Sequence, residues 1–161
     1  MASEAGALSH DALVLFVEDS DDDWFAYSRL LDRHYPELGT FRVATAEAAS
    51  TWLHAQLDDD AGCLPRLVVL DLNLPGRDGR ALLEELGRSP ELSTIPVVIF
   101  STSAHPDDIR ECFRLHVNAY HQKPMGLTEM REELSRILDY WTADRSCLPK
   151  LSRRWARSSA G

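Results

Sequence analysis

The chain has 161 residues and a formal net charge of −9, with 44% hydrophobic and 27% charged residues. These proportions are typical of a soluble globular protein, and the length suits one domain with a sizeable core. The acidic balance argues against nucleic-acid binding, which usually needs a basic face. The longest apolar run, residues 12–17, is far too short to span a membrane, and the first eleven residues lack the Lys or Arg of a secretory signal.

Short apolar runs alternate with longer helical patterns along the chain. The runs predict five strands, over residues 13–17, 41–44, 66–71, 95–100 and 118–122. The third and fourth runs are almost continuously apolar, as expected for strands that are covered on both faces of a parallel sheet.

A helical pattern follows each predicted strand. Ser20 and Thr45 are predicted to cap the first two helices. Residues 79–88 predict a short third helix, and Pro106 suits the first turn of the fourth. Thr128 is predicted to cap the last helix, which carries an apolar stripe.

Alternating strands and helices predict a three-layer α/β domain around a parallel sheet. We assign residues 11–141 to this domain, 1–10 to an N-terminal tail and 142–161 to a C-terminal extension that is rich in basic residues. The three cysteines and six histidines are scattered without metal-ligand spacing. We therefore predict free thiols, a reducing cytoplasmic location and no histidine-based metal site.

Acidic residues crowd the end of the first predicted strand, where Glu18, Asp19 and residues 21–23 place five carboxylates within six positions. Such like charges repel by about 1 kcal/mol per close pair in water. Residues 21–23 fall in the first turn of a helix, where the helix dipole favours anions by about 0.3–1 kcal/mol each. Glu18 and Asp19 lie outside that turn and suggest a bound cation. On this segment alone, a solvated acidic face remains an alternative for all five.

Other polar residues follow the later strands at the same end. In open parallel sheets, ligands bind beyond the carboxyl ends of the strands, so these residues should share one neighbourhood. A hard divalent cation, Mg²⁺ in particular, would neutralise three carboxylates there. The residues expected to converge are Glu18, Asp19, Asp71, Ser101 and Lys123.

Four motifs occur in order, each at a predicted strand end: FVEDS, VVLDLNLPGRDG, VVIFSTSA and YHQKP. Together they resemble the receiver domains of two-component response regulators over about residues 11–140. The resemblance implies a CheY-like, flavodoxin-like doubly wound sheet with strand order 2-1-3-4-5 and five helices. It also implies a signalling protein that catalyses its own phosphotransfer and dephosphorylation and is not otherwise an enzyme.

By this resemblance, Asp71 is the phosphoacceptor. Its carboxylate would attack the phosphorus of a phosphohistidine on a sensor histidine kinase and become an aspartyl phosphate. The implied Mg²⁺ ligands are Asp19 and Asp71 directly, Glu18 through water, and the backbone carbonyl of Asn73. The metal would neutralise and align the transferred group.

The remaining site residues are also assigned by the resemblance. Lys123 and Ser101 would contact phosphoryl oxygens, and the bond between Lys123 and Pro124 is expected to be cis. Ser101 and Tyr120 match the paired switch positions of the family. On phosphorylation the hydroxyl group would move toward the phosphoryl group and the aromatic ring would turn inward, reshaping the surface of the fourth and fifth helices.

The segment LDYWTADRSCLPK resembles the ending of stand-alone receivers that partner bacterial phytochrome histidine kinases. Tyr140, Trp141, Leu148 and Pro149 match that pattern, whereas residues 150–161 lie outside it. This resemblance implies a phytochrome partner and a homodimer through the fourth and fifth helices and the extension. The alternative is that Trp141 only closes the core.

No output domain is expected after the last helix, so we expect output through protein contacts, without DNA or membrane binding. One alternative keeps the chemistry but makes the chain a phosphorelay intermediate that passes phosphate to a histidine phosphotransfer protein. An independent phosphohydrolase is disfavoured because Asp71 lacks a second acid two residues later. A degenerate receiver is disfavoured by the complete set of site residues.

Overall fold

The computed structural model describes residues 13–76 and 78–143. Its five strands are all parallel and form one sheet in the order β2-β1-β3-β4-β5. This confirms the predicted topology. The strands are β1 (Leu13–Val17), β2 (Gly39–Val43), β3 (Leu67–Leu70), β4 (Val97–Ser101) and β5 (Ala119–Gln122).

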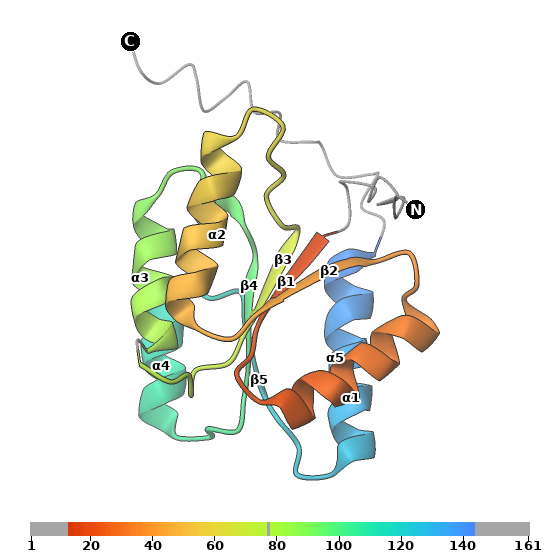
Figure 1. Ribbon diagram of the computed structural model, residues 1–161. Coiled ribbons are helices and arrows are strands. Elements are labelled where there is room, and N and C mark those ends of the chain that lie inside the picture. The colour runs from red at the N-terminus through yellow and green to blue at the C-terminus, as the bar shows by residue number, and fades with distance from the viewer. Residues whose placement is uncertain (1–12, 77, 144–161) are drawn as a thin grey trace, which may run out of the picture.

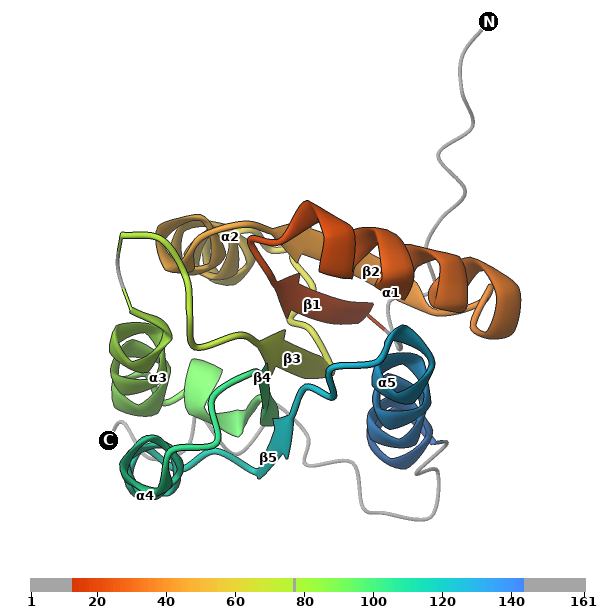
Figure 2. The same ribbon diagram turned by 90° about the horizontal axis from the view of Figure 1, so that it is seen from below.

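Five α-helices cover the two faces of the sheet. They are α1 (Asp21–His34), α2 (Ala46–Asp58), α3 (Gly79–Arg88), α4 (Pro106–Arg114) and α5 (Leu127–Thr142). Helices α1 and α5 pack on one face, and α2, α3 and α4 pack on the other (Figures 1 and 2). A single 3₁₀ turn, η1 (Leu92–Thr94), precedes β4.

Side-chain caps fix the starts of four helices. The Ser20 hydroxyl accepts the Asp23 N–H at 3.2 Å, and the Thr45 hydroxyl accepts the Ala48 N–H at 3.1 Å. The predicted cap at Thr128 is wrong. Helix α5 begins one residue earlier, at Leu127, with the extended Gly126 at the N-cap position and no side-chain cap. The Gly126 carbonyl already accepts the Met130 N–H, so Thr128 falls inside the first turn.

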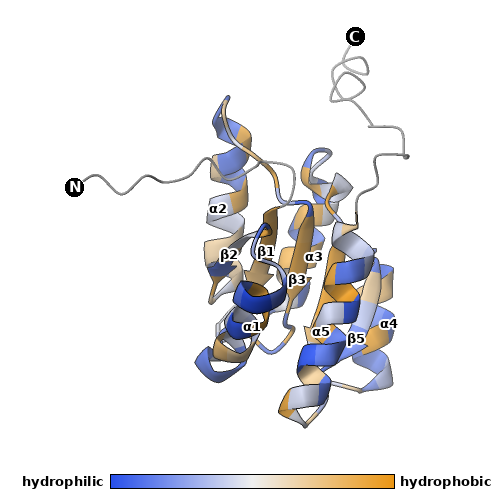
Figure 3. Ribbon diagram, turned by 90° about the vertical axis from the view of Figure 1, so that its right-hand side faces the viewer, coloured by the Kyte–Doolittle hydropathy of each residue, from blue (hydrophilic) through white to orange (hydrophobic). Residues whose placement is uncertain are grey.

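Each face of the sheet has its own apolar core. One core joins β1, β3 and β4 to helices α2, α3 and α4, and the other joins them to α1 and α5. Apolar residues therefore gather on the strands and polar residues on the outer helix surfaces (Figure 3). Full burial of one leucine or isoleucine contributes about 1.5–3 kcal/mol, so these two layers hold the strand ends in fixed positions.

The second core contains an aromatic group beneath the carboxyl ends of the strands. Tyr27 stacks on Phe100 with ring centroids 5.8 Å apart, and Phe16 lies 5.4 Å from Trp24. Tyr27 is almost fully buried, although it comes from α1 only nine residues after Glu18. Trp141 packs partly buried against the same core, in agreement with its predicted place in the apolar stripe of α5.

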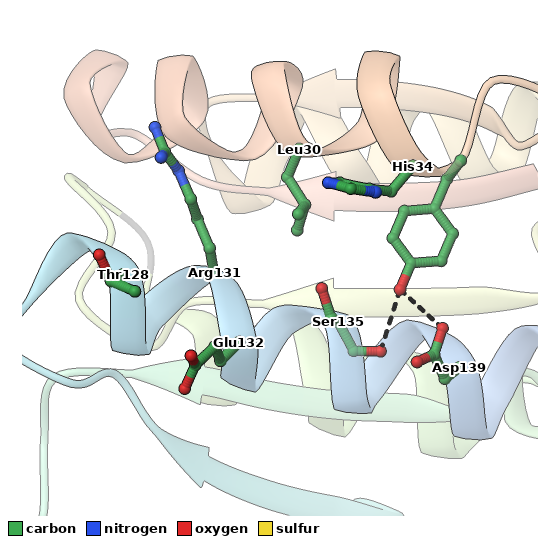
Figure 4. Close-up of a pocket in the computed structure, with 8 residues that line it drawn as sticks. Leu30, His34, Thr128, Arg131, Glu132, Ser135 and Asp139 are labelled. Carbon is green, nitrogen blue, oxygen red and sulfur yellow. Dashed lines mark hydrogen bonds between the residues drawn. The ribbon is translucent and has the colours of Figure 1, made fainter.

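Tyr35 ties the ends of α1 and α5 together. Its hydroxyl donates to Asp139 Oδ1 at 2.6 Å and lies 3.2 Å from the Ser135 carbonyl. These contacts stand at one end of a groove between the two helices (Figure 4). The residues that line this groove are separate from those predicted to form the site.

Cys112 is buried in the α4 layer, where burial raises the pKa of its thiol to about 11. Cys112 is a free thiol, as predicted, the Cys63 Sγ lies 3.6 Å from the Leu64 carbonyl, and Cys147 lies outside the described residues. Within residues 13–76 and 78–143, no helix combines the length and apolar character that a membrane crossing requires.

Candidate functional site

The predicted site residues lie at the carboxyl ends of the strands. Backbone hydrogen bonds between neighbouring strands continue to these residues and hold them in place. The Glu18 N–H donates to the Val43 carbonyl at 3.0 Å, and the Asp71 N–H donates to the Val17 carbonyl at 3.0 Å. The Lys123 N–H donates to the Ser101 carbonyl at 2.7 Å. The side chains that follow β1, β3, β4 and β5 are therefore held next to one another.

Three carboxylates form the centre of this edge. Glu18, Asp19 and Asp71 each offer an oxygen, and the three oxygens lie within 4.8 Å of one another. Glu18 and Asp71 are only 2% and 7% exposed, whereas Asp19 faces solvent. Buried carboxylates at this spacing require a positive charge.

Lys123 supplies a positive charge in the structure. Its Nζ lies 2.5 Å from Glu18 Oε2, 2.7 Å from Asp23 Oδ2 and 3.0 Å from Asp71 Oδ2. The lysine side chain is 2% exposed, and its Nζ stands 5.8 Å from the ring centroid of Tyr27. One buried cation therefore contacts three acids.

The prediction that residues 21–23 belong only to the first turn of the helix is wrong for Asp23. Asp21 and Asp22 are exposed, as expected. The Asp23 carboxylate instead turns inward to Lys123, while its N–H still donates to Ser20. The residue thus serves both the helix start and the site.

The surroundings of Glu18 and Lys123 move their pKa values in the same direction. Burial raises the pKa of Glu18 above its usual range, and the nearby Lys123 only partly offsets this effect. Burial alone would lower the pKa of Lys123, but its neighbours Tyr27, Glu18 and Asp71 outweigh burial and raise it. Burial also raises the pKa of Tyr27, so its hydroxyl stays neutral beside Glu18 Oε2, 3.4 Å away.

The loop after β3 shapes the surroundings of Asp71. The Asn73 N–H donates to Asp71 Oδ1 at 3.0 Å, on the oxygen that Lys123 does not contact. Asn73 Nδ2 reaches the buried hydroxyl of Ser101 at 3.5 Å. A Cβ atom at Gly79 would lie 2.9 Å from the Asp71 carbonyl, so glycine allows α3 to start close to the acid.

Tyr120 lies toward the β4–α4 loop. Its hydroxyl donates to the Ser103 carbonyl at 2.7 Å, and burial raises its pKa. The Ser103 hydroxyl donates to Asp108 at 2.5 Å, and Asp108 in turn pairs with Arg80 of α3. A chain of polar contacts therefore joins Tyr120 to α4 and α3.

The expected cis bond between Lys123 and Pro124 is wrong, because the described residues contain no cis peptide bond. Lys123 reaches its three carboxylates with the trans isomer, which is the lower-energy form of most X–Pro bonds.

A parallel, doubly wound sheet with buried acids and a lysine at its carboxyl edge defines the receiver class of α/β proteins. The family model for the response regulator receiver domain matches residues 14–135. The chain therefore belongs to the response regulator receiver family, whose members are two-component signalling proteins.

Two relatives align with most of the chain. The probable methanogenesis regulatory protein FilR2 of Methanothrix harundinacea is 36% identical over 132 residues, covering 80% of this chain and 83% of FilR2. Response regulator Rcp1 of Synechocystis is 33% identical over 129 residues, covering 80% of this chain and 88% of Rcp1.

Solved structures of similar proteins share the fold. The phosphorylated cyanobacterial phytochrome response regulator RcpA has a TM-score of 0.76 at 32% identity, with 82% of this chain and 94% of RcpA covered. The Mn²⁺-bound form of Rcp1 has a TM-score of 0.75 at 32% identity, with 83% and 96% covered.

Proposed function

We propose that this chain acts as a response regulator that accepts a phosphoryl group on Asp71 from a sensor histidine kinase. The observation that carries the proposal is the environment of Asp71, a nearly buried carboxylate 3.0 Å from Lys123 Nζ and clustered with Glu18 and Asp19. Glu18 is a poorer acceptor, because it is 2% exposed against 7% for Asp71, and its oxygens accept three hydrogen bonds, from Ser20, Lys123 and Tyr27.

The site residues fit a Mg²⁺ ion. Three carboxylates and a nearby backbone carbonyl are hard oxygen donors, which Mg²⁺ prefers, and the similar Rcp1 was solved with Mn²⁺. We assign Asp19 and Asp71 as direct ligands, Glu18 as a ligand through water, and the Asn73 carbonyl as a further ligand. When bound, the ion would neutralise charge on the transferred group.

The chain's own residues supply the rest of the chemistry. The Asp71 carboxylate attacks phosphorus, so that a P–O bond forms while the P–N bond of the phosphohistidine breaks. Lys123 remains protonated throughout because its pKa is raised, and it can therefore pair with a phosphoryl oxygen at Asp71. Ser101 offers a hydroxyl donor from the end of β4. Hydrolysis of the aspartyl phosphate would return the chain to its starting state.

The proposal is tested by incubating the purified chain with acetyl phosphate, a small-molecule phosphodonor, and Mg²⁺. We expect one acid-labile phosphoryl group per chain by intact-mass measurement, and none when a chelator removes the metal. A chain that stays unmodified with both this donor and a panel of purified histidine kinases would contradict the proposal.

We also propose a phytochrome kinase as the partner, a cytoplasmic location and a homodimer through α4, α5 and the C-terminal extension. The relation to the phytochrome response regulator RcpA supports the first of these. Exposed aromatic side chains support the dimer face, because Phe113 on α4 and Tyr140 on α5 are 50% and 64% exposed. Phosphotransfer profiling and light scattering with and without phosphorylation would test partner and dimer separately.

Ser101 and Tyr120 are the proposed switch pair, and Tyr120→Phe tests the second of them. The change removes the hydrogen bond to the Ser103 carbonyl and should lower the free energy of unfolding by about 1 kcal/mol, as measured by urea denaturation. Phosphorylation of Asp71 should continue at a similar rate, because Tyr120 does not contact the acids. Tyr120→Ala removes the ring itself, and an unchanged dimer or partner response to phosphorylation in that variant would contradict the switch role.

A further inference from the structure

Arg42 lies on the edge strand β2, beside the loop that carries Glu18 and Asp19. It pairs in register with Phe16 of β1, one residue before the end of that strand. Its neighbour Phe41 stacks on Trp52 of α2, with ring centroids 5.1 Å apart. Because successive side chains point to opposite faces of a strand, Arg42 points to the α1 face, and only 20% of its side chain is exposed.

The guanidinium group of Arg42 contacts the backbone of both acidic residues. Its Nε donates to the Glu18 carbonyl at 2.9 Å, and its Nη2 donates to the Asp19 carbonyl at 3.2 Å. Nη2 also lies 2.9 Å from Asp21 Oδ1, and Cζ lies 5.8 Å from the ring centroid of Trp24. The planar guanidinium presents its donors in a fixed fork, so it restrains two successive peptide groups together.

Strand β2 therefore holds Glu18 at both of its backbone polar groups. The Val43 carbonyl accepts the Glu18 N–H, and the Arg42 side chain donates to the Glu18 carbonyl. With the peptide fixed in this way, the Glu18 and Asp19 side chains can leave the loop toward Asp71. Sheet pairing alone would fix only the N–H side of this loop.

We propose that Arg42 is a positioning residue that holds the Glu18–Asp19 backbone so that both carboxylates meet Asp71 at the divalent-cation site. This inference rests on the proposed function, since it concerns the same site. The charge and the geometry of Arg42 have opposite effects on metal affinity. Its positive charge repels a divalent cation and lowers the affinity, whereas its hold on the Glu18–Asp19 backbone raises it. The direction of the change in metal affinity therefore distinguishes positioning from a pure charge effect.

The test is calorimetric titration of the full chain with Mg²⁺ and with Mn²⁺. Arg42→Ala should weaken binding by roughly tenfold or more, which is the usual cost of losing a residue that orients metal ligands. Arg42→Lys should also weaken binding, because a lysine keeps the charge but cannot contact both carbonyls as a fork. The metal concentration for half-maximal phosphorylation by acetyl phosphate should rise by the same factor.

Arg29→Ala is the matched control. Arg29 also lies over an aromatic ring, with its Cζ 5.7 Å from the centroid of Phe25, and its loss changes the net charge equally. It should leave the metal affinity close to that of the wild type, because its described contacts do not include the Glu18–Asp19 loop.

Three results would overturn the role of Arg42. They are unchanged or tighter metal binding in Arg42→Ala, wild-type binding in Arg42→Lys, or a lowered melting temperature in the metal-free variant with no loss of metal affinity. A wild-type chain that binds neither metal would instead contradict the metal site of the proposed function, so the two failures are distinguishable.

Discussion

Asp71→Asn is expected to abolish acid-labile phosphorylation of the chain, reducing the rate by at least about a thousandfold, as loss of a covalent nucleophile does. A neutral amide oxygen is a poor nucleophile toward phosphorus. The substitution should preserve the fold, because asparagine has almost the same size and shape and its one oxygen can still accept the Asn73 N–H, although the hydrogen bond from Lys123 to the other carboxylate oxygen is then lost. The measurement is intact mass and acid-labile phosphate after incubation with acetyl phosphate and Mg²⁺.

Asp22→Asn is the matched control for this experiment. It makes the same chemical change in the first turn of α1, where the residue is exposed, and should leave phosphorylation unchanged. Metal binding should weaken in Asp71→Asn but persist, because Glu18 and Asp19 remain. Labelling that survives in Asp71→Asn would mean that the acceptor is misassigned, and peptide mapping would then locate the true one.

The convergence of Glu18, Asp19, Asp71 and Lys123 could be predicted from sequence because it depends on few assumptions. Parallel strands share one carboxyl edge, so recognising each strand and its next residue is enough to place the side chains together. The two buried apolar runs, β3 and β4, made the parallel sheet recognisable. The roles of these residues in phosphotransfer remain predictions until the variants are measured.

Asp23 and Arg42 could not be predicted in the same way. Capping and the helix dipole already explained Asp23, and its turn toward Lys123 depends on how α1 packs through Tyr27 and Trp24 against Phe16. Arg42 acts across 23 and 24 sequence positions on a loop of another strand. The one available signal was the alternation of side chains along β2. It places Arg42 and Phe41 on opposite faces of the sheet, and Arg42 lies on the α1 face.

Two other predictions, the cap at Thr128 and the cis bond at Pro124, were wrong for different reasons. Thr128 is a favourable cap residue, but the backbone enters the helix at Leu127, directly after Gly126. The cis bond at Pro124 was carried over from the family and was not argued from residues of this chain. The proposed dimer contact of the C-terminal extension falls mostly on residues 144–161, outside the described residues, and stays a prediction.

Lys123→Ala should lower the free energy of unfolding by about 3 kcal/mol in the presence of a chelator, as removal of one partner from a buried ion pair typically does. The Glu18 and Asp71 side chains, 3% and 8% exposed, would lose their shared cation. Urea denaturation measures the loss. Lys123→Met is the control for packing, because methionine keeps most of the side-chain volume over Tyr27. If the lost charge is the cause, this variant should lose a similar amount of unfolding free energy.

The destabilisation of the Lys123 variants should depend on pH and on metal. The raised pKa of Glu18 means that the folded state binds more protons than the unfolded state between the two pKa values, so this group favours folding as the pH falls. Without Lys123, which lowers that pKa, the effect should grow, and the variants should regain stability as the pH falls. Saturating Mg²⁺ should also restore stability at neutral pH, because the carboxylates can still bind a cation.

The same variants separate phosphorylation from its output. Asp71 keeps its nucleophilic oxygen in Lys123→Ala, so phosphorylation by acetyl phosphate should still occur and Mg²⁺ binding should be largely retained. The dimer or partner response should be lost, because the phosphoryl group no longer has the buried cation that follows β5 to pair with. An unchanged response would contradict the role assigned to Lys123, and an unchanged unfolding free energy of Lys123→Met in chelator would contradict the charge cluster itself.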